Sequence, residues 1–174
     1  MTTLEFLSPR AAETGEFRPR LTSPLARVLG SARPGLGLHD LSLSLAKLEV
    51  RGDLDAIVDA DLVWIAPRRG LVLAPYGEGE PLEARLREQV ATVIDLTGAL
   101  AGLRIERVDA VTLMRRLTDL DLDNLPAVGA VARVPALVRG GGRAFELFWP
   151  QEYGHYLAEV VVDTATALGK GASA

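Results

Sequence analysis

The stretch that decides the fold lies between residues 103 and 117 and reads LRIERVDAVTLMRRL. Residues 103–108 are predicted to form a β-strand. Asp109 stands where it can cap a helix, and apolar residues then recur at i, i+3, i+4 and i+7 at Ala110, Leu113, Met114 and Leu117. This spacing places the apolar side chains on one face of the helix, so we expect the helix to pack against the sheet that contains the preceding strand.

Upstream of this stretch, leucines alternate with Ser42 and Ser44 over 41–45, as in a half-buried strand. The alternation then slips, which predicts a bulge near Ala46 and Lys47. Apolar runs at 62–66 and 71–74 flank the sequence PRRG, which is typical of a hairpin connection. A helix is predicted through residues 81–89 and a strand over 91–96.

Downstream, strands are predicted over 130–138 and 144–149, joined by a turn at three consecutive glycines, 140–142. Pro135 indicates that the first of these strands lies at a sheet edge. A closing helix places apolar and aromatic residues of 153–168 on one stripe, and Gly169 is predicted to end it. Most connections between strands are too short for a helical crossover, so we predict an α+β fold with an antiparallel or mixed sheet, or sheets, and packed helices.

The first 36 residues differ from the rest of the chain. Prolines recur at 9, 19, 24 and 34, between several arginines, and this spacing excludes long helices and central strands. We predict an extended Pro/Arg-rich arm over residues 1–36, with at most one short helix at 24–29. Residues 37–174 are predicted to form a single α+β domain.

Composition excludes several classes of protein. The chain has 174 residues, of which 48% are hydrophobic, and its net charge is −4, so we expect a globular protein with no nucleic-acid partner. Cysteine is absent, which excludes disulfides, thiolate nucleophiles and zinc–thiolate sites. There is no signal-peptide pattern and no membrane-spanning apolar run, so we expect a cytoplasmic protein that does not bind membranes.

Motifs for metal binding and catalysis are incomplete. The acidic run at 118–124 begins like a calcium loop, but Asn124 and Ala130 stand where glycine and glutamate are required. We therefore interpret the run as a solvated loop, and we expect no metal site. His39 and His155 are far apart and are interpreted as a turn residue and a partly exposed helix residue. No catalytic residue is assigned.

The glycine-rich turn and the strand after it provide the remaining candidates for ligand binding. Arg139 and Arg143 flank the three glycines, where guanidinium groups and free amides could bind an anion, and Glu146 follows. A plain hairpin with solubilising arginines is the favoured interpretation. Trp64 and Trp149 each lie among apolar residues of a predicted strand. Most of the aromatic residues are expected in the core, and an exposed one would indicate an interface.

Four segments resemble the aminomethyltransferase (glycine-cleavage T-protein) folate-binding superfamily. They are VIDLT at 93–97, LRIERVDA at 103–110, LMRRLTDLD at 113–121 and AFELFWP at 144–150. In length and segment order the chain resembles a small branch of that superfamily, the gamma-subunit family of heterotetrameric sarcosine oxidases. This resemblance implies a fold similar to the T-protein folate-binding domain.

Two positions depart from the superfamily pattern. Arg107 and Val108 replace the usual Gly-Pro before Asp-Ala, and the glycine-rich turn continues into Arg143-Ala144-Phe145 without the aspartate that acts at the pterin. The second departure implies that this chain performs no folate chemistry itself.

The resemblance therefore implies a non-catalytic subunit that binds no cofactor of its own, in a hetero-oligomer with larger flavoprotein subunits. FAD or FMN, NAD and tetrahydrofolate would belong to those partners, which oxidise sarcosine or a related N-methyl amine, pass the one-carbon unit to tetrahydrofolate and form hydrogen peroxide. The alternative is a free-standing folate-binding or one-carbon-transfer protein, with Arg139, Arg143 or Glu146 at the pterin edge or the pteroylglutamate carboxylate. A scaffold in an unrelated complex is a third possibility.

Overall fold

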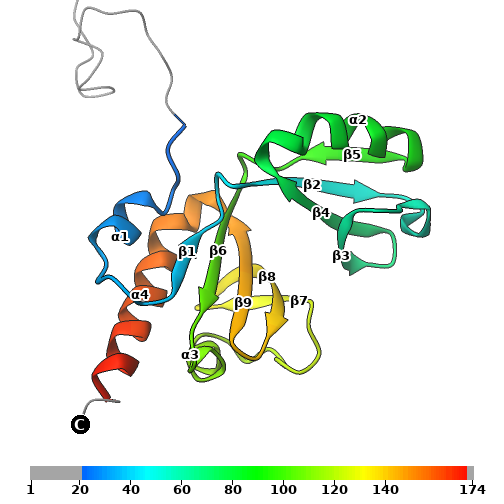
Figure 1. Ribbon diagram of the computed structural model, residues 1–174. Helices are drawn as coiled ribbons and strands as arrows, with labels where there is room; N and C mark the ends of the chain where they lie inside the picture. Colours follow the sequence, from blue (N-terminus) through cyan, green and yellow to red (C-terminus); the bar gives the residue numbers. More distant parts are fainter. Residues whose placement is uncertain (1–20, 172–174) are drawn as a thin grey trace, which may run out of the picture.

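The computed structural model describes residues 21–171, which form two antiparallel sheets with helices packed on them (Figure 1). This arrangement confirms the predicted α+β class, and every strand pairing is antiparallel. Among the described residues, no helix is both long and apolar enough to cross a membrane.

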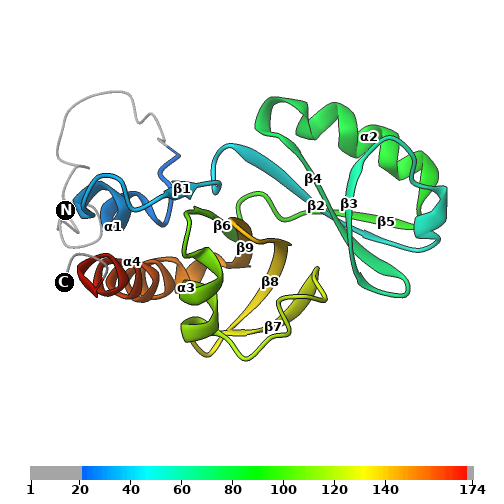
Figure 2. The same cartoon turned by 60° about the horizontal axis from the view of Figure 1, so that its bottom comes forward.

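The first sheet has five strands in the order β1-β6-β9-β8-β7. Helices α1, α3 and α4 pack against this sheet, and their buried side chains form one core together with those of its strands. Figure 2 shows the three helices together beside the sheet. Trp149, Leu103 and Leu113 lie at the centre of this core and are fully buried. The bounds are β1 Leu38–Asp40, β6 Leu100–Glu106, β7 Ala127–Val131, β8 Val134–Gly141, β9 Ala144–Pro150, α1 Ala26–Ser31, α3 Ala110–Leu117 and α4 Gly154–Gly171.

The second sheet has four strands in the order β3-β4-β2-β5, and helix α2 covers one of its faces (Figure 1). Leu86 of the helix packs among Leu48, Val50 and Val72 of the strands. The bounds are β2 Leu45–Arg51, β3 Asp61–Ala66, β4 Arg69–Pro75, β5 Thr92–Asp95 and α2 Gly79–Gln89, with short 3-10 turns at Leu54–Ala56, Tyr76–Glu78 and Gln151–Tyr153.

The two sheets meet over a third apolar cluster. Val63, Leu71 and Leu73 of the second sheet pack against Leu137 and Phe148 of the first. The chain crosses between the sheets twice, from β1 to β2 and from β5 to β6. The helix-free faces of the two sheets therefore form the junction that positions the polar groups described below.

The predicted strand over 41–45 is wrong. Residues 41–44 form the turn that carries the chain from β1 in one sheet to β2 in the other. Ser42 of this turn is buried, and its hydroxyl is satisfied by a hydrogen bond from the Gly102 amide of β6 (3.1 Å). The slip in alternation thus marks a change of sheet instead of a bulge.

The predicted strand over 130–138 is also two strands, β7 and β8, joined at Ala132 and Arg133. Both turn residues have positive φ, 47° and 69°, a conformation that asparagine and glycine normally supply in two-residue hairpins. Pro135 does not mark an edge strand, since β8 lies between β7 and β9. The β8–β9 pairing begins only at Leu137, so the missing amide of Pro135 disrupts no ladder there.

The remaining local predictions need smaller changes. Asp109 does stand at the start of α3, but its side chain makes no capping hydrogen bond and instead pairs with Arg107. Helix α4 continues past Gly169 to Gly171. In the described part of the predicted arm, residues 21–36, helix α1 contributes Val28 to the first core, and Leu25 just before it is fully buried there; residues 1–20 lie outside the described residues.

Candidate functional site

A network of charged side chains lies on the helix-free face of the first sheet, beside the sheet junction. Glu146 of β9 is directly opposite Arg139 of β8 on one side and Arg104 of β6 on the other. Arg139 Nε donates to Glu146 Oε2 (2.7 Å), and Arg104 Nη1 lies 3.4 Å from Glu146 Oε1. The ladder register therefore aligns three charged groups in a row across three strands.

Arg139 also reaches across to the second sheet. Its Nη1 donates to both carboxylate oxygens of Asp61 at the start of β3, at 2.7 and 2.8 Å. Burial alone would lower the pKa of Arg139, but the hydrogen bonds and charges of Asp61 and Glu146 outweigh it and raise this pKa. The guanidinium is thus a charged link between the two sheets.

This network contains two of the three residues predicted from sequence. Arg139 and Glu146 lie together, whereas Arg143 is exposed in the β8–β9 turn, where its carbonyl accepts from the Arg107 amide (3.0 Å). A shallow hollow of about 350 Å³ beside the network is lined by Arg104, Arg139, Gly140, Ala144 and Glu146. An incoming carboxylate would have to displace Asp61 or Glu146 to bind Arg139.

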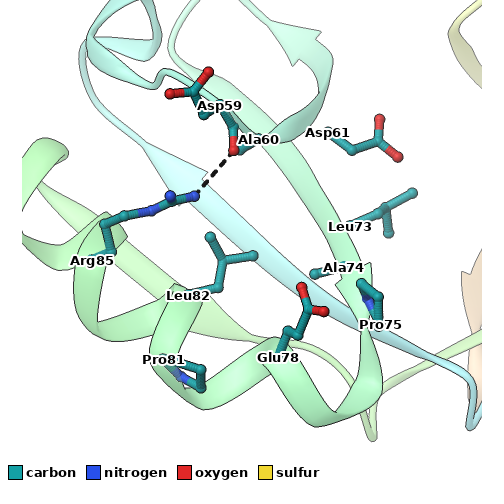
Figure 3. A pocket seen from close by; sticks show the side chains of 10 residues that line it. All are labelled: Asp59, Ala60, Asp61, Leu73, Ala74, Pro75, Glu78, Pro81, Leu82 and Arg85. Atoms are coloured by element: carbon teal, nitrogen blue, oxygen red, sulfur yellow. Dashed lines mark hydrogen bonds between the residues drawn. The ribbon is translucent and has the colours of Figure 1, made fainter.

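A larger open groove of about 480 Å³ lies on the other side of Asp61, and Figure 3 shows its lining. Leu73 and Pro75 of β4 and Leu82 of α2 supply apolar lining, and Glu78 adds a carboxylate. Arg85 closes one end by donating to the Asp59 carbonyl (3.2 Å). Because three separate segments build the groove, no local motif could have predicted it.

Two buried charges on β2 were not singled out by sequence reasoning. Lys47 is fully buried, and its Nζ donates to the carbonyls of Ser42 (2.8 Å) and Leu45 (2.9 Å) in the sheet-to-sheet turn. Burial lowers its pKa to about 8, although the charges of Asp40 and Asp95 act in the opposite direction. The ammonium therefore holds the crossover between the sheets.

Glu49, two residues along the same strand, is the second buried charge. Burial alone would raise its pKa, but hydrogen bonds from Arg69 (2.6 Å) and Arg51 (2.7 Å) and their charges lower it overall. Alternate residues of a strand share a face, so Lys47 and Glu49 lie on the same side of β2. The sequence predicted only a bulge near Lys47 and gave no signal that this side of the strand is buried.

The acidic run at 118–124 forms a loop, as predicted. Asp121 accepts hydrogen bonds from Asn124 Nδ2 (2.6 Å) and the Asp123 amide (3.1 Å), while Leu120 and Leu122 pack against the first core. Within residues 21–171, no group of three or more His, Asp or Glu side chains is placed to hold a metal ion.

The histidines lie apart. His39 is exposed and lies in strand β1, whereas the sequence predicted a turn at this position. His155 Nε2 lies 3.0 Å from Glu159 Oε1, one turn further along α4. Neither histidine joins the charged network.

Comparison with solved structures shows the same fold in two proteins. The first is a chain of the heterotetrameric sarcosine oxidase from Corynebacterium sp. U-96, solved in complex with pyrrole 2-carboxylate. It superposes with a TM-score of 0.68 at 17% identity, over 84% of this chain and 95% of that one.

The second is the glycine cleavage system aminomethyltransferase T from Bartonella henselae, with a TM-score of 0.55 at 17% identity. The match covers 72% of this chain and 45% of that one. No family model matches the sequence, and no curated protein matches it.

Proposed function

We propose that this chain is the non-catalytic, gamma-type subunit of a hetero-oligomeric, flavin-dependent sarcosine oxidase-like complex. The observation that carries this proposal is the match to a chain of a heterotetrameric sarcosine oxidase, because it extends over 95% of that chain. A whole subunit of that assembly thus has the size and topology of this protein. The aminomethyltransferase, by contrast, has more than half of its length outside the match.

The charged network agrees with a structural role. Arg139 has its donors directed to two carboxylates of its own chain, one on each sheet. Arg104 Nε also donates to Glu106 Oε2 (2.9 Å), which adds a third carboxylate to the network. The formal charge of Arg104, Arg139, Glu106, Glu146 and Asp61 together is −1, so the network offers no net attraction to an anionic ligand such as the carboxylates of a folate. The ion pairs of the network are suited to hold the two sheets in a fixed position relative to each other.

In the proposed complex the larger subunits hold the flavin, NAD and tetrahydrofolate, and they oxidise sarcosine or a related N-methyl amine with formation of hydrogen peroxide. The test is to tag the chain in the organism that encodes it, purify it gently, and assay the product for sarcosine-dependent peroxide. We expect larger, stoichiometric subunits, visible flavin absorbance and peroxide formation.

The isolated chain, expressed alone, is the matched control and is expected to produce no peroxide. Sarcosine oxidation by the isolated chain would contradict the proposal. Submillimolar binding of tetrahydrofolate in a titration would favour the free-standing folate-binding protein. In that case Arg139→Gln and Glu146→Gln should weaken binding, and Arg143→Gln would test whether the exposed turn takes part.

A further inference from the structure

The described chain contains two copies of one structural unit, residues 38–89 and residues 92–171. Strands β4 and β9 have the same length, and each ends at a proline. Each is followed by a one-turn 3-10 helix and then by an α-helix that begins at a glycine. The second unit differs mainly by the insertion of α3 and β7 between its strands β6 and β8.

The crossovers between the sheets are copies of each other as well. They read Asp-Leu-Ser at 40–42 and Asp-Leu-Thr at 95–97, and in each the aspartate accepts a hydrogen bond from the amide two residues later (2.8 and 2.7 Å). The hydroxyl of the third residue accepts from the amide of Gly102 in the first crossover and of Lys47 in the second (3.1 and 3.0 Å). Each unit therefore places its first strand, β1 or β5, in the sheet of the other unit (Figure 1).

This equivalence pairs Ala74 of β4 with Trp149 of β9. Each is the residue before the final proline of its strand, and each lies opposite an alanine of the neighbouring strand, Ala46 or Ala101. Both lie on the helix-covered face, since Trp149 belongs to the first core and Ala74 alternates with Val72 of the core under α2. Trp149 is fully buried, whereas Ala74 is only partly buried and lines the open groove of about 480 Å³.

A second pair of equivalent residues differs in the same way. Tyr156 is the third residue of α4, and its hydroxyl donates to the Ala132 carbonyl (3.2 Å). The third residue of α2 is Pro81, which lines the groove together with Ala74 and Leu82 (Figure 3). The groove thus lies where the first unit has small side chains in place of the two aromatic side chains of the second unit.

The charges around the groove do not favour an anionic occupant. Asp59, Asp61, Glu78 and Arg85 line it, and Asp61 is already paired with Arg139. The other three side chains sum to a formal charge of −1. A ligand that carries carboxylates therefore gains no attraction here, and the apolar lining suits an uncharged ring.

The open shape of the groove favours a side chain of another protein over a free small molecule. Pockets for free ligands bury about 70–90% of the ligand surface, whereas a partner protein covers the open side with the rest of its interface. Tyr76, which is 48% exposed, lies between the groove residues Pro75 and Glu78, and exposed aromatic residues are enriched at interfaces. Trp64 is 44% exposed but lies further along β3, opposite Gly70, and does not line the groove.

We propose that this groove is the docking site for an aromatic side chain of a partner subunit. That side chain takes the place in the first unit that the indole of Trp149 takes in the second. The proposal rests on the proposed function, which supplies the partner. Aromatic side chains that fill pockets are among the residues that contribute most to the affinity of protein interfaces.

The test is made on the complex that co-purifies with the tagged full-length chain. Ala74→Trp fills the groove with the side chain that the second unit carries, and Ala130→Trp, at an exposed position of β7 outside the groove, is the matched control. We expect Ala74→Trp to weaken assembly about tenfold or more, as loss of an interface anchor does, and the control to leave assembly unchanged.

A second variant covers the case in which Ala74→Trp does not fold, which circular dichroism of the isolated chain would show. Pro81→Tyr introduces the other aromatic side chain of the second unit at an exposed position, so it narrows the groove without changing a buried residue. It should also weaken assembly.

Free indole tests the chemical class of the occupant without a partner. Titrated into the isolated full-length chain, indole should shift the methyl resonances of Leu73 and Leu82, which line the groove. In Ala74→Trp the same resonances should not respond, because the groove is already filled.

The outcomes separate the two proposals. A complex that assembles equally well with both groove variants overturns the docking site and leaves the subunit role standing. Leucine resonances of the wild type that do not move at millimolar indole overturn the choice of an aromatic occupant. A tagged chain that purifies with no stoichiometric partner overturns both proposals.

Discussion

Replacing Lys47 with methionine should abolish a rise in stability that the wild-type protein shows at alkaline pH. The pKa of Lys47 falls from 10.5 to about 8 on folding because the side chain is fully buried. Two carbonyls, of Ser42 and Leu45, accept its hydrogen bonds. A neutral amine has two N–H donors, so it satisfies both carbonyls without the desolvation penalty of a charge.

The sign of the effect follows from proton binding. Between pH 8 and 10.5 the folded chain binds fewer protons at Lys47 than the unfolded chain, so the free energy of unfolding rises with pH in that window. The full interval corresponds to about 3 kcal/mol, at about 1.4 kcal/mol per pKa unit. Methionine has a similar length and no titratable group, so the variant loses this contribution to the slope.

The measurement is urea unfolding of both proteins at several pH values from about 7 to about 10, followed by circular dichroism. Contributions from groups that both proteins share cancel in the difference between them. Arg115→Met, at an exposed site, should keep the wild-type slope. If the free energy of unfolding of Lys47→Met rises with pH as steeply as that of the wild type, folding does not lower the pKa of Lys47. That result would refute the reasoning.

Three further predictions concern the junctions of the fold. Asp61→Asn combined with Arg139→Met in a double-mutant cycle should give a coupling free energy of about 1 kcal/mol in urea unfolding, and additive effects would exclude a link between the sheets. Gly37→Ala should lower stability by more than about 2 kcal/mol, since φ is +65° and a Cβ would lie 2.1 Å from the Glu106 carbonyl oxygen; a melting temperature equal to that of wild type would contradict this. Arg107→Met should lower stability by about 1–3 kcal/mol by removing the partner of Asp109 and the bond to a carbonyl of α4, and hydrogen exchange in α4 that stays at the wild-type rate would count against it.

Local patterns predicted the elements whose structure depends on local spacing. The strand-to-helix stretch at β6 and α3 was predicted because its apolar side chains repeat within one element and face one core. The β3–β4 hairpin was predicted from Pro67 and Gly70 between two apolar runs.

The features that the sequence did not predict depend on contacts between residues far apart in the chain. Ala132 and Arg133 take a left-handed turn without glycine or asparagine, and Ala132 is held there by the Leu117 carbonyl and the Tyr156 hydroxyl. The same limit applies to the site. Arg139 and Glu146 flank one turn and could be paired from sequence, whereas Asp61 reaches the network only because the two sheets pack together.

The most direct test of the central claim is sedimentation of the gently purified, tagged chain, followed simultaneously by its protein signal and by visible flavin absorbance. The subunit role predicts one boundary in which both signals move together, at a mass several times the 18.6 kDa of this chain. A colourless species that sediments at the mass of the chain alone would contradict it.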